Sequence, residues 1–257
     1  MSEASQARLN LIETRWSLVG QAHGGGIPAL AARDILFHRY SGAAWRYLLA
    51  VARSQEIAEE LFQEFSLRLI RGDFSRSSQE RGRFRDYIKT VLINLVRDYH
   101  RKRRCQPVSL SYPLADPASD PHRASASKTT SHGTPTFAEE DPDATFLQSW
   151  RSELLHRVWK ALASQKPKYH AVLTAQIELP TKEAREKAKY VEQRLGQAFT
   201  ANHYRVALHR ARRVFASLLK HEVAVSLDDP SEDQLFRELK LLRLLRYCSD
   251  EEGKACQ

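Results

Sequence analysis

A run of basic side chains at the end of a predicted helix is the first candidate for chemistry. Five of the eight residues from Arg97 to Arg104 are lysine or arginine. One face of the same helix collects polar side chains at spacings of four, three and four residues: Thr90, Asn94, Arg97 and Arg101. One or two cations would suffice to complement the helix dipole or to keep a helix end solvated. The excess favours a face that contacts phosphates, because each neutralised phosphate releases counterions.

Aromatic rings lie among these charges. Phe74 and Phe84 flank a glycine-containing loop before the helix, and Tyr87 and Tyr99 lie within the helix. Proteins that bind single strands combine a basic groove with rings on which bases stack. Tyr87 and Tyr99 also fit the apolar stripe of the helix, so core packing and base stacking are equally open for these two. Phe74 and Phe84 are the better stacking candidates, with a plug at the helix junction as the alternative.

The helix expected before this one carries the opposite charge. From Glu56 to Ile70, apolar residues recur every four positions, which is typical of an amphipathic helix. Its other face carries Glu56, Glu60, Gln63 and Glu64. Such a face is either a solvated surface or a docking site for a basic protein surface. A helix suited to binding phosphates beside a helix suited to binding a protein indicates an adaptor within a complex that acts on nucleic acid.

The composition of the whole chain agrees with a polyanionic partner. The 257 residues include 40 Lys and Arg against 31 Asp and Glu, which gives a formal net charge of +9. This charge favours nucleic acid or an anionic membrane surface. No apolar run approaches the roughly 20 residues of a membrane span, and the first residues lack a secretory signal. Three scattered cysteines form no metal-ligand spacing and fit a reducing compartment, so we expect a cytoplasmic protein without membrane insertion.

The periodicity predicts an all-α fold of two small helical domains joined by a flexible linker. Glycine and proline are sparse in two helical blocks, and proline, serine and threonine are dense between them. Such a stretch buries too little apolar surface to offset its ordering entropy. We predict a first domain over residues 1–104 and a linker over 105–145. A second domain over 146–221 and a C-terminal helical tail over 222–257 follow.

The second block contains a predicted helix-turn-helix. Gly196 is placed to end one helix and Thr200 to cap the next. From Ala201 to Leu219 there are four arginines and no acidic residue. The second helix of this motif puts its first residues into the major groove, although a generic basic helix hairpin would show the same pattern. The candidates for contacts to base edges are Asn202, His203 and Arg205. The candidates for contacts to phosphates are Arg210, Arg212 and Arg213.

These motifs resemble a known family. Two consecutive stretches resemble the core domain of bacterial RNA polymerase sigma factors of the sigma-70 family, in its small extracytoplasmic-function type. They are AEELFQEFSLRLIRGDF and the following GRFRDYIKTVLINLVRDYHRKRR. A later stretch, YRVALHRARRVF, resembles the sigma minus-thirty-five domain. An early stretch, TRWSLV, resembles the start of a planctomycete-type subgroup. The second match departs from the commonest pattern, because Tyr204 replaces a small aliphatic residue and the stretch after Gly196 is about two residues longer.

The resemblance implies a role for each helix. In that family the acidic helix docks on the coiled coil of the polymerase β′ subunit, and the following loop and helix recognise and melt the minus-ten element. It assigns to the polymerase contact Glu60, Gln63, Glu64 and Phe65. It assigns to the minus-ten element Phe84, Arg85, Tyr87, Lys89, Asn94, Arg97 and Arg101. The implied partners are core RNA polymerase, through β′ and β, and promoter DNA, while an anti-sigma factor is left open.

We therefore interpret the chain as a sigma factor that directs promoter-specific initiation. No nucleophile with a base, Gly-rich phosphate loop or metal spacing is present in the sequence, so we expect no enzyme activity and no cofactor or metal. One alternative is a stand-alone helix-turn-helix regulator, which needs no polymerase-docking face. A second is a metal-dependent nucleic-acid-processing enzyme, disfavoured because the acidic helix offers no His or Asp partner.

Overall fold

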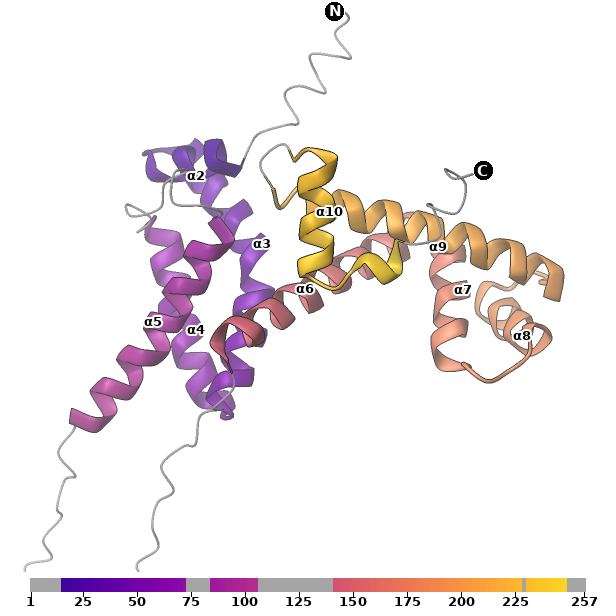
Figure 1. The fold of residues 1–257 in the computed structure, drawn as a ribbon, viewed down its shortest axis with the longest axis horizontal. Helices are drawn as coiled ribbons and strands as arrows, with labels where there is room; N and C mark the ends of the chain where they lie inside the picture. Colours follow the sequence, from indigo (N-terminus) through magenta and orange to yellow (C-terminus); the bar gives the residue numbers. More distant parts are fainter. Residues whose placement is uncertain (1–14, 73–83, 106–140, 228–229, 249–257) are drawn as a thin grey trace, which may run out of the picture.

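The computed structural model describes residues 15–72, 84–105, 141–227 and 230–248 (Figure 1). Every regular element within these ranges is a helix and none is a strand, so the predicted all-α class is confirmed. Phe74 and most of the predicted linker lie outside the described residues.

Helix α3 is the centre of the first helical group. The group consists of α2 (Arg15–His23), α3 (Ile27–Ala52), α4 (Gln55–Arg71) and α5 (Phe84–Cys105). Helix α3 packs on each of the other three. Of the predicted apolar positions of α4, Leu61, Phe65 and Leu69 are buried and Ile57 is partly buried. The pattern of one residue every four therefore correctly identified the side of α4 that faces the core.

Helix α4 ends where only glycine fits well. Gly72 has φ of 76°, a left-handed conformation that a Cβ atom disfavours, and its amide donates to the carbonyl of Leu69 at 3.2 Å. The side chain of Arg33 covers this turn, and its Nη1 donates to the carbonyl of Ile70 at 3.2 Å. The end of α4 is thereby tied to the first half of α3.

The second helical group follows residue 140. It consists of α6 (Pro142–Gln165), α7 (Pro167–Glu178), α8 (Ala184–Leu195), α9 (Ala201–Ala224), α10 (Glu232–Leu241) and the short 3-10 helix η2 (Leu245–Tyr247). Helix α6 begins a few residues earlier than the periodicity at Phe146 suggested. The carboxylate of Asp141 accepts from the amide of Asp143 at 3.0 Å, and Pro142 occupies the first helical position.

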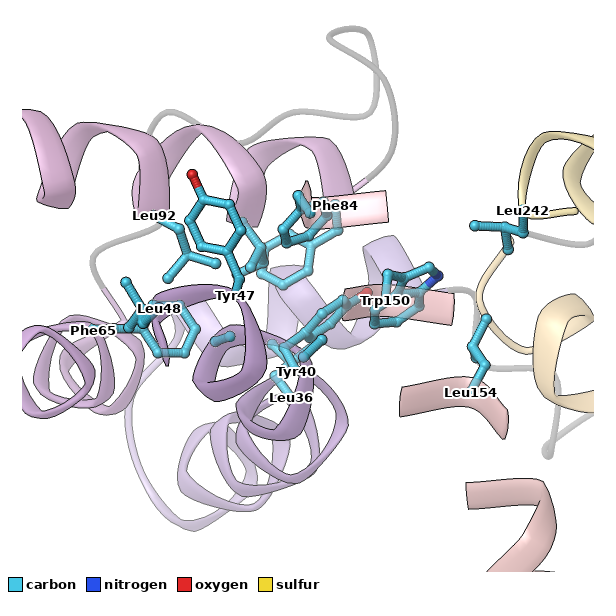
Figure 2. Close-up of a cluster of buried hydrophobic side chains, with 14 of the residues drawn as sticks. Leu36, Tyr40, Tyr47, Leu48, Phe65, Phe84, Leu92, Trp150, Leu154 and Leu242 are labelled. Atoms are coloured by element: carbon cyan, nitrogen blue, oxygen red, sulfur yellow. The ribbon is translucent and has the colours of Figure 1, made fainter. Parts of the chain in front are cut away.

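The larger hydrophobic core continues from the first group into the second (Figure 2). Tyr40 of α3 stacks on Trp150 of α6 with ring centroids 5.3 Å apart and planes at 17°. Tyr47 of α3 meets Phe146 of α6 edge-on at 5.9 Å. A smaller core lies among α7, α8 and the first half of α9. Helix α6 thus bridges the α3 bundle and the α7–α9 unit, as Figure 1 shows. The boundaries of the two predicted domains stay a prediction.

Ion pairs reinforce the contact between the groups. Arg39 of α3 is buried, and its Nη1 and Nη2 donate to the carboxylate and the backbone carbonyl of Glu222 in α9, at 2.6 and 2.7 Å. Arg46 of α3 reaches Glu153 of α6 at 3.3 Å. A buried pair adds little net stability but is costly to break, because one charge would stay buried without its partner. These pairs therefore fix how α6 and α9 sit on α3.

Gly42 of α3 lies directly against the carboxylate of Glu153 in α6. A Cβ atom at this position would lie 2.3 Å from Oε2 of Glu153, which is itself buried. We expect Gly42→Ala to lower the free energy of unfolding by about 1–3 kcal/mol, because the helices must separate or Glu153 must leave its place. Urea unfolding followed by circular dichroism measures this change.

Gly20→Ala in α2 is the matched control. A Cβ atom there would meet nothing within 4 Å, so the substitution should raise stability by about 0.5–1 kcal/mol through helix propensity alone. Equal shifts of the urea midpoint in the two variants would contradict a close approach of α3 to α6 at Gly42.

Candidate functional site

The outward face of α4 is acidic. Its exposed polar side chains include Glu56, Glu59, Glu60, Gln63 and Glu64, and the exposed Arg71 lies at the end of the helix. Arg68 Nε donates to Oε1 of Glu64 at 2.9 Å, and Gln55 Nε2 donates to Oε1 of Glu59 at 2.8 Å, both across one helical turn. These exposed contacts hold the side chains in place without neutralising the face, because only Glu64 gains a cation.

Two exposed apolar residues continue this face toward the end of α4. Leu67 is 46% exposed and Ile70 is 52% exposed, although both are large and hydrophobic. We call Glu60, Gln63, Glu64, Leu67 and Ile70 together the α4 face. The sequence analysis did not single out the two apolar members. Their signal was available, because neither falls on the four-residue spacing of the buried stripe.

Phe65 lies on the other side of the helix. Its side chain is 1% exposed and its ring centroid is 6.2 Å from that of Phe62. Of the four residues assigned to the polymerase contact, the structure therefore brings Glu60, Gln63 and Glu64 together on the surface and places Phe65 in the core. Phe65 supports the α4 face from beneath.

The polar face of α5 lies as the spacing predicted. Thr90, Asn94, Arg97 and Arg101 are all exposed, and Lys102 and Arg103 extend the positive charge. Arg101 Nη2 lies 3.1 Å from Oδ1 of Asp98 on the same helix, in a solvent-exposed pair of little energetic weight. Figure 1 shows the basic end of α5 reaching out from the bundle. This end is accessible to a large polyanion.

The first turn of α5 is covered instead. Phe84 is 3% exposed, meets Tyr40 edge-on at 5.3 Å and stacks on Tyr87 at 5.8 Å. Arg85 is 5% exposed and forms an ion pair with Glu238 of α10, which is fully buried. Phe84 and Arg85, both assigned to the minus-ten element, are therefore inaccessible in this structure.

Lys89, Tyr87 and Tyr99 are intermediate cases. Lys89 is partly buried, and its Nζ lies 3.1 Å from Oδ1 of Asp143, in the first turn of α6. Tyr87 and Tyr99 pack against the larger core but stay partly exposed. Arg103 Nη1 lies 3.4 Å from the Tyr99 hydroxyl. Both tyrosines thus contribute to the core and still present an edge to solvent.

The pKa of the buried Tyr47 hydroxyl reflects the charges of nearby residues in α5 and α6. Burial raises the pKa of its hydroxyl to about 12, the carboxylate of Asp143 adds to this shift, and the guanidinium of Arg97 opposes it. Tyr47 therefore stays neutral at physiological pH and serves as packing, not as a base. The opposite effects of Asp143 and Arg97 on this pKa agree with a basic α5 approached by an acidic start of α6.

The predicted helix-turn-helix geometry is present at both caps. Gly196 has φ of 65° and its amide donates to the carbonyl of Glu192 at 2.8 Å, which ends α8. The hydroxyl of Thr200 accepts from the amide of His203 at 3.2 Å, which starts α9. Both capping predictions are confirmed. Tyr204 is buried in the smaller core and its hydroxyl donates to Oε1 of Gln176 at 3.0 Å, so this larger residue is accommodated in the unit.

The polar residues of α9 form an exposed basic surface. All six candidates for DNA contact are exposed: Asn202, His203, Arg205, Arg210, Arg212 and Arg213. The buried side of the same helix uses Tyr204, Ala207 and Ala211 to pack on α7 and α8. Helix α9 therefore presents its first turns outward on the support of α7 and α8, as is typical of a recognition helix.

Two kinds of site are missing from the residues that the structure describes. Among them, no group of three or more His, Cys, Asp or Glu side chains could hold a metal ion. No helix in the described ranges is long and apolar enough to cross a membrane.

Comparison with known families finds a match within the first helical group. Residues 36–105 match the family model of sigma-70 region 2. This part of the chain is therefore similar to sigma-70 region 2. The matched span runs from within α3 to the last residue of α5, so it contains both the α4 face and the polar face of α5. No curated protein and no solved structure matches the chain.

The region 2 match supports membership of the sigma-70 family. It also supports the role of a sigma factor, which is to bind RNA polymerase and recognise a promoter. The match ends at residue 105, so the helices after residue 140 are interpreted from their own geometry.

Several residues of the sigma-70 region 2 surroundings escaped the sequence analysis. They hold the region against later helices: Arg39, Asp143, Glu222 and Glu238. A buried arginine inside an apolar stripe signals that some carboxylate must pair with it. The carboxylate partners of Arg39 and Arg85 lie more than a hundred residues away along the chain, and the partner of Lys89 lies about fifty away, so the pattern of one sequence does not reveal which carboxylates they are.

Proposed function

We propose that this chain is a cytoplasmic sigma factor of the extracytoplasmic-function type, in the planctomycete-like subgroup. It binds core RNA polymerase and directs it to a promoter, whose minus-ten element it opens. The observation that carries this proposal is the matched region 2, which presents an acidic helix face and a basic helix face on neighbouring helices. Sigma factors act by binding, so no catalytic residue is proposed.

The α4 face is the proposed contact with the β′ subunit. Its carboxylates suit a basic partner surface and would steer the encounter, while Leu67 and Ile70 supply apolar area that water would otherwise cover. Charge complementarity around a small apolar centre is the common composition of a specific protein interface. Phe65 contributes indirectly, by fixing α4 from the core.

The polar face of α5 is the proposed contact with the minus-ten element. Arg97 and Arg101 neutralise phosphates, and Asn94 has both a donor and an acceptor for a base edge. A base that leaves the duplex costs a few kcal/mol of unstacking, which a ring or pocket must offset. The exposed edges of Tyr87 and Tyr99 are the proposed stacking surfaces nearest to these polar residues. Phe84, Arg85 and Lys89 complete the proposed site once they become accessible.

The α7–α9 unit is the proposed reader of the minus-thirty-five element. Asn202, His203 and Arg205 lie at the start of α9, where a recognition helix meets base edges. Arg210, Arg212 and Arg213 lie further along and suit phosphates. The predicted linker, 105–145, joins this unit to region 2, and the β subunit of the polymerase is a further proposed partner.

Association with core polymerase is the first test of this function. Labelled full-length chain, titrated with core polymerase in the absence of DNA, should form a saturable one-to-one complex. A stand-alone regulator would bind DNA without polymerase and would give no such complex. A chain that binds DNA but fails to bind core polymerase at any tested concentration would rule out a sigma factor.

A further inference from the structure

The structure shows the first turns of α5 held by acidic residues from the second helical group. Arg85 is paired with Glu238 of α10, and Lys89 is paired with Asp143 of α6 at 3.1 Å. Both basic residues belong to the proposed minus-ten site. Each carboxylate therefore occupies a position beside a cation where a DNA phosphate would otherwise lie.

The pair between Arg85 and Glu238 is buried on both sides. Arg85 is 5% exposed and Glu238 is 0% exposed. A carboxylate is removed from water at a cost of several kcal/mol and persists only with close partners. Glu238 is the seventh residue of α10, a helix that follows the proline-containing break after α9 and begins with a capping box between Ser231 and Gln234. The chain thus builds a separate, well-capped helix that carries an acidic residue into contact with α5.

Apolar contacts anchor the same tail in the larger core. Leu239, Leu242 and Leu244 are at most 3% exposed and belong to that core, as does Cys248, which is 6% exposed. Figure 2 shows Leu242 and Leu154 on the side of Trp150 that faces away from Leu48 and Phe65. The tail therefore does more than cover the edge of the α7–α9 unit, because it packs into the core shared with α3 and α6.

The rest of the polar face of α5 is left open. Asn94, Arg97 and Arg101 are exposed while Phe84 and Arg85 are covered. Phe84 is locked through Tyr40, which in turn stacks on Trp150 of α6. Helices α6 and α10 therefore cover only the start of α5, and phosphates can first reach the exposed basic end at Arg97 and Arg101.

We propose that this arrangement is a closed state in which the C-terminal tail, residues 232–248, blocks the proposed minus-ten site by pairing Glu238 with Arg85. This proposal rests on the proposed sigma function and names its regulation. In the free chain, Glu238 and Asp143 compete with DNA phosphates for Arg85 and Lys89. Binding to polymerase and promoter separates α6 and α10 from α5, which exposes Phe84 and Arg85. The chain thereby opens DNA efficiently only as part of the polymerase complex.

Two full-length variants should open the closed state by different means. Glu238→Gln keeps the shape of the side chain but removes the buried counter-charge of Arg85, whose Nε then has, among the described residues, only Asp86 at 3.8 Å. Leu242→Asp places a charge in the apolar anchor. Leu241→Asp is the matched control, because Leu241 is the neighbouring residue and is 51% exposed. If the open state of the wild type is populated at about 10% or less, opening variants should bind DNA about tenfold more tightly or better.

The first measurement is binding of the free chain to a single-stranded oligonucleotide that carries the non-template strand of a promoter mapped by transcription. Glu238→Gln and Leu242→Asp should show the gain, and Leu241→Asp should match the wild type. General destabilisation would reduce binding, so a gain separates opening from damage. If Leu242→Asp does not fold, Glu238→Gln carries this comparison. Unchanged affinity of the folded Glu238→Gln variant would overturn the closed state.

The second measurement uses Cys248 as a reporter in a Cys105→Ser, Cys256→Ser background. Its thiol should react slowly with a maleimide in the free wild-type chain and faster in the complex with core polymerase and promoter. Normal initiation with Cys248 still protected would overturn the closed state alone. Absence of initiation by the wild type and by every opened variant would overturn the proposed function, and the closed state with it.

Discussion

Replacing both Glu60 and Glu64 with lysine is expected to weaken association with core RNA polymerase by about 100-fold or more. The two carboxylates are exposed at the centre of the α4 face, and like charges brought together at an interface cost several kcal/mol. Because each 1.4 kcal/mol is a factor of ten, two reversals should remove measurable association at ordinary concentrations. Fluorescence anisotropy of the labelled chain titrated with core polymerase, without DNA, measures the effect.

Two controls separate the position of the charge from the amount of charge. Glu186→Lys with Glu192→Lys gives the same change in net charge on exposed residues of α8 and should leave the affinity close to that of the wild type. Glu60→Gln with Glu64→Gln removes the charge without reversing it and should give an intermediate loss. Equal affinities for the α4 and the α8 lysine variants would contradict docking through the α4 face.

Replacing Arg97 and Arg101 with alanine is expected to weaken promoter binding and to flatten its dependence on salt. Each lost phosphate contact on duplex DNA reduces the log–log slope by about 0.9, so the double variant should lose about two units of slope. Between 50 and 200 mM salt, its affinity should fall about tenfold less than that of the wild type. Promoter binding by the reconstituted polymerase complex, measured over this salt range, gives both values.

Arg71→Ala with Lys160→Ala is the matched control for this experiment. Both side chains are exposed and neither lies on the polar face of α5. This variant loses the same net charge and should keep the wild-type slope. A slope that changes equally in the two double variants would show that Arg97 and Arg101 act only through the overall charge of the chain.

Local patterns in the sequence carried the prediction of these two faces. The buried stripe of α4 and the polar stripe of α5 follow directly from helical periodicity, because residues three and four apart share a face whatever the rest of the fold does. The caps at Gly196 and Thr200 are equally local, since a left-handed glycine and a hydroxyl acceptor each act within one turn. Elements of this kind can be read from a single sequence.

Contacts between distant segments could not be read in the same way. Tyr40 and Trp150 both belong to predicted apolar stripes, but nothing in their spacing says that the two stripes share one core. The burial of Phe84 and Arg85 has the same origin, because it depends on α3, α6 and α10 together. The charge pattern of each helix predicts the composition of its surface, whereas the contacts between residues of distant helices are seen only in the three-dimensional structure.

Phe65 illustrates the limit of assigning a whole motif to a surface. It belongs to the quoted resemblance with Glu60 and Glu64, yet it falls on the four-residue spacing of Leu61 and Leu69 and is buried with them. Leu67 and Ile70 show the converse, since two large apolar residues lie on the surface beside the acids. Helical phase, applied residue by residue, separates the two groups correctly.

Promoter-specific initiation is the central claim, and one transcription experiment tests it most directly. Core polymerase, with and without the full-length chain, is given fragmented genomic DNA of the organism that encodes it, and the 5′ ends of the transcripts are mapped. The account predicts a set of new start sites that share sequence elements about ten and thirty-five base pairs upstream, as the family resemblance implies, and that disappear with Glu60→Lys and Glu64→Lys. The same start sites and yields with and without the chain would contradict it.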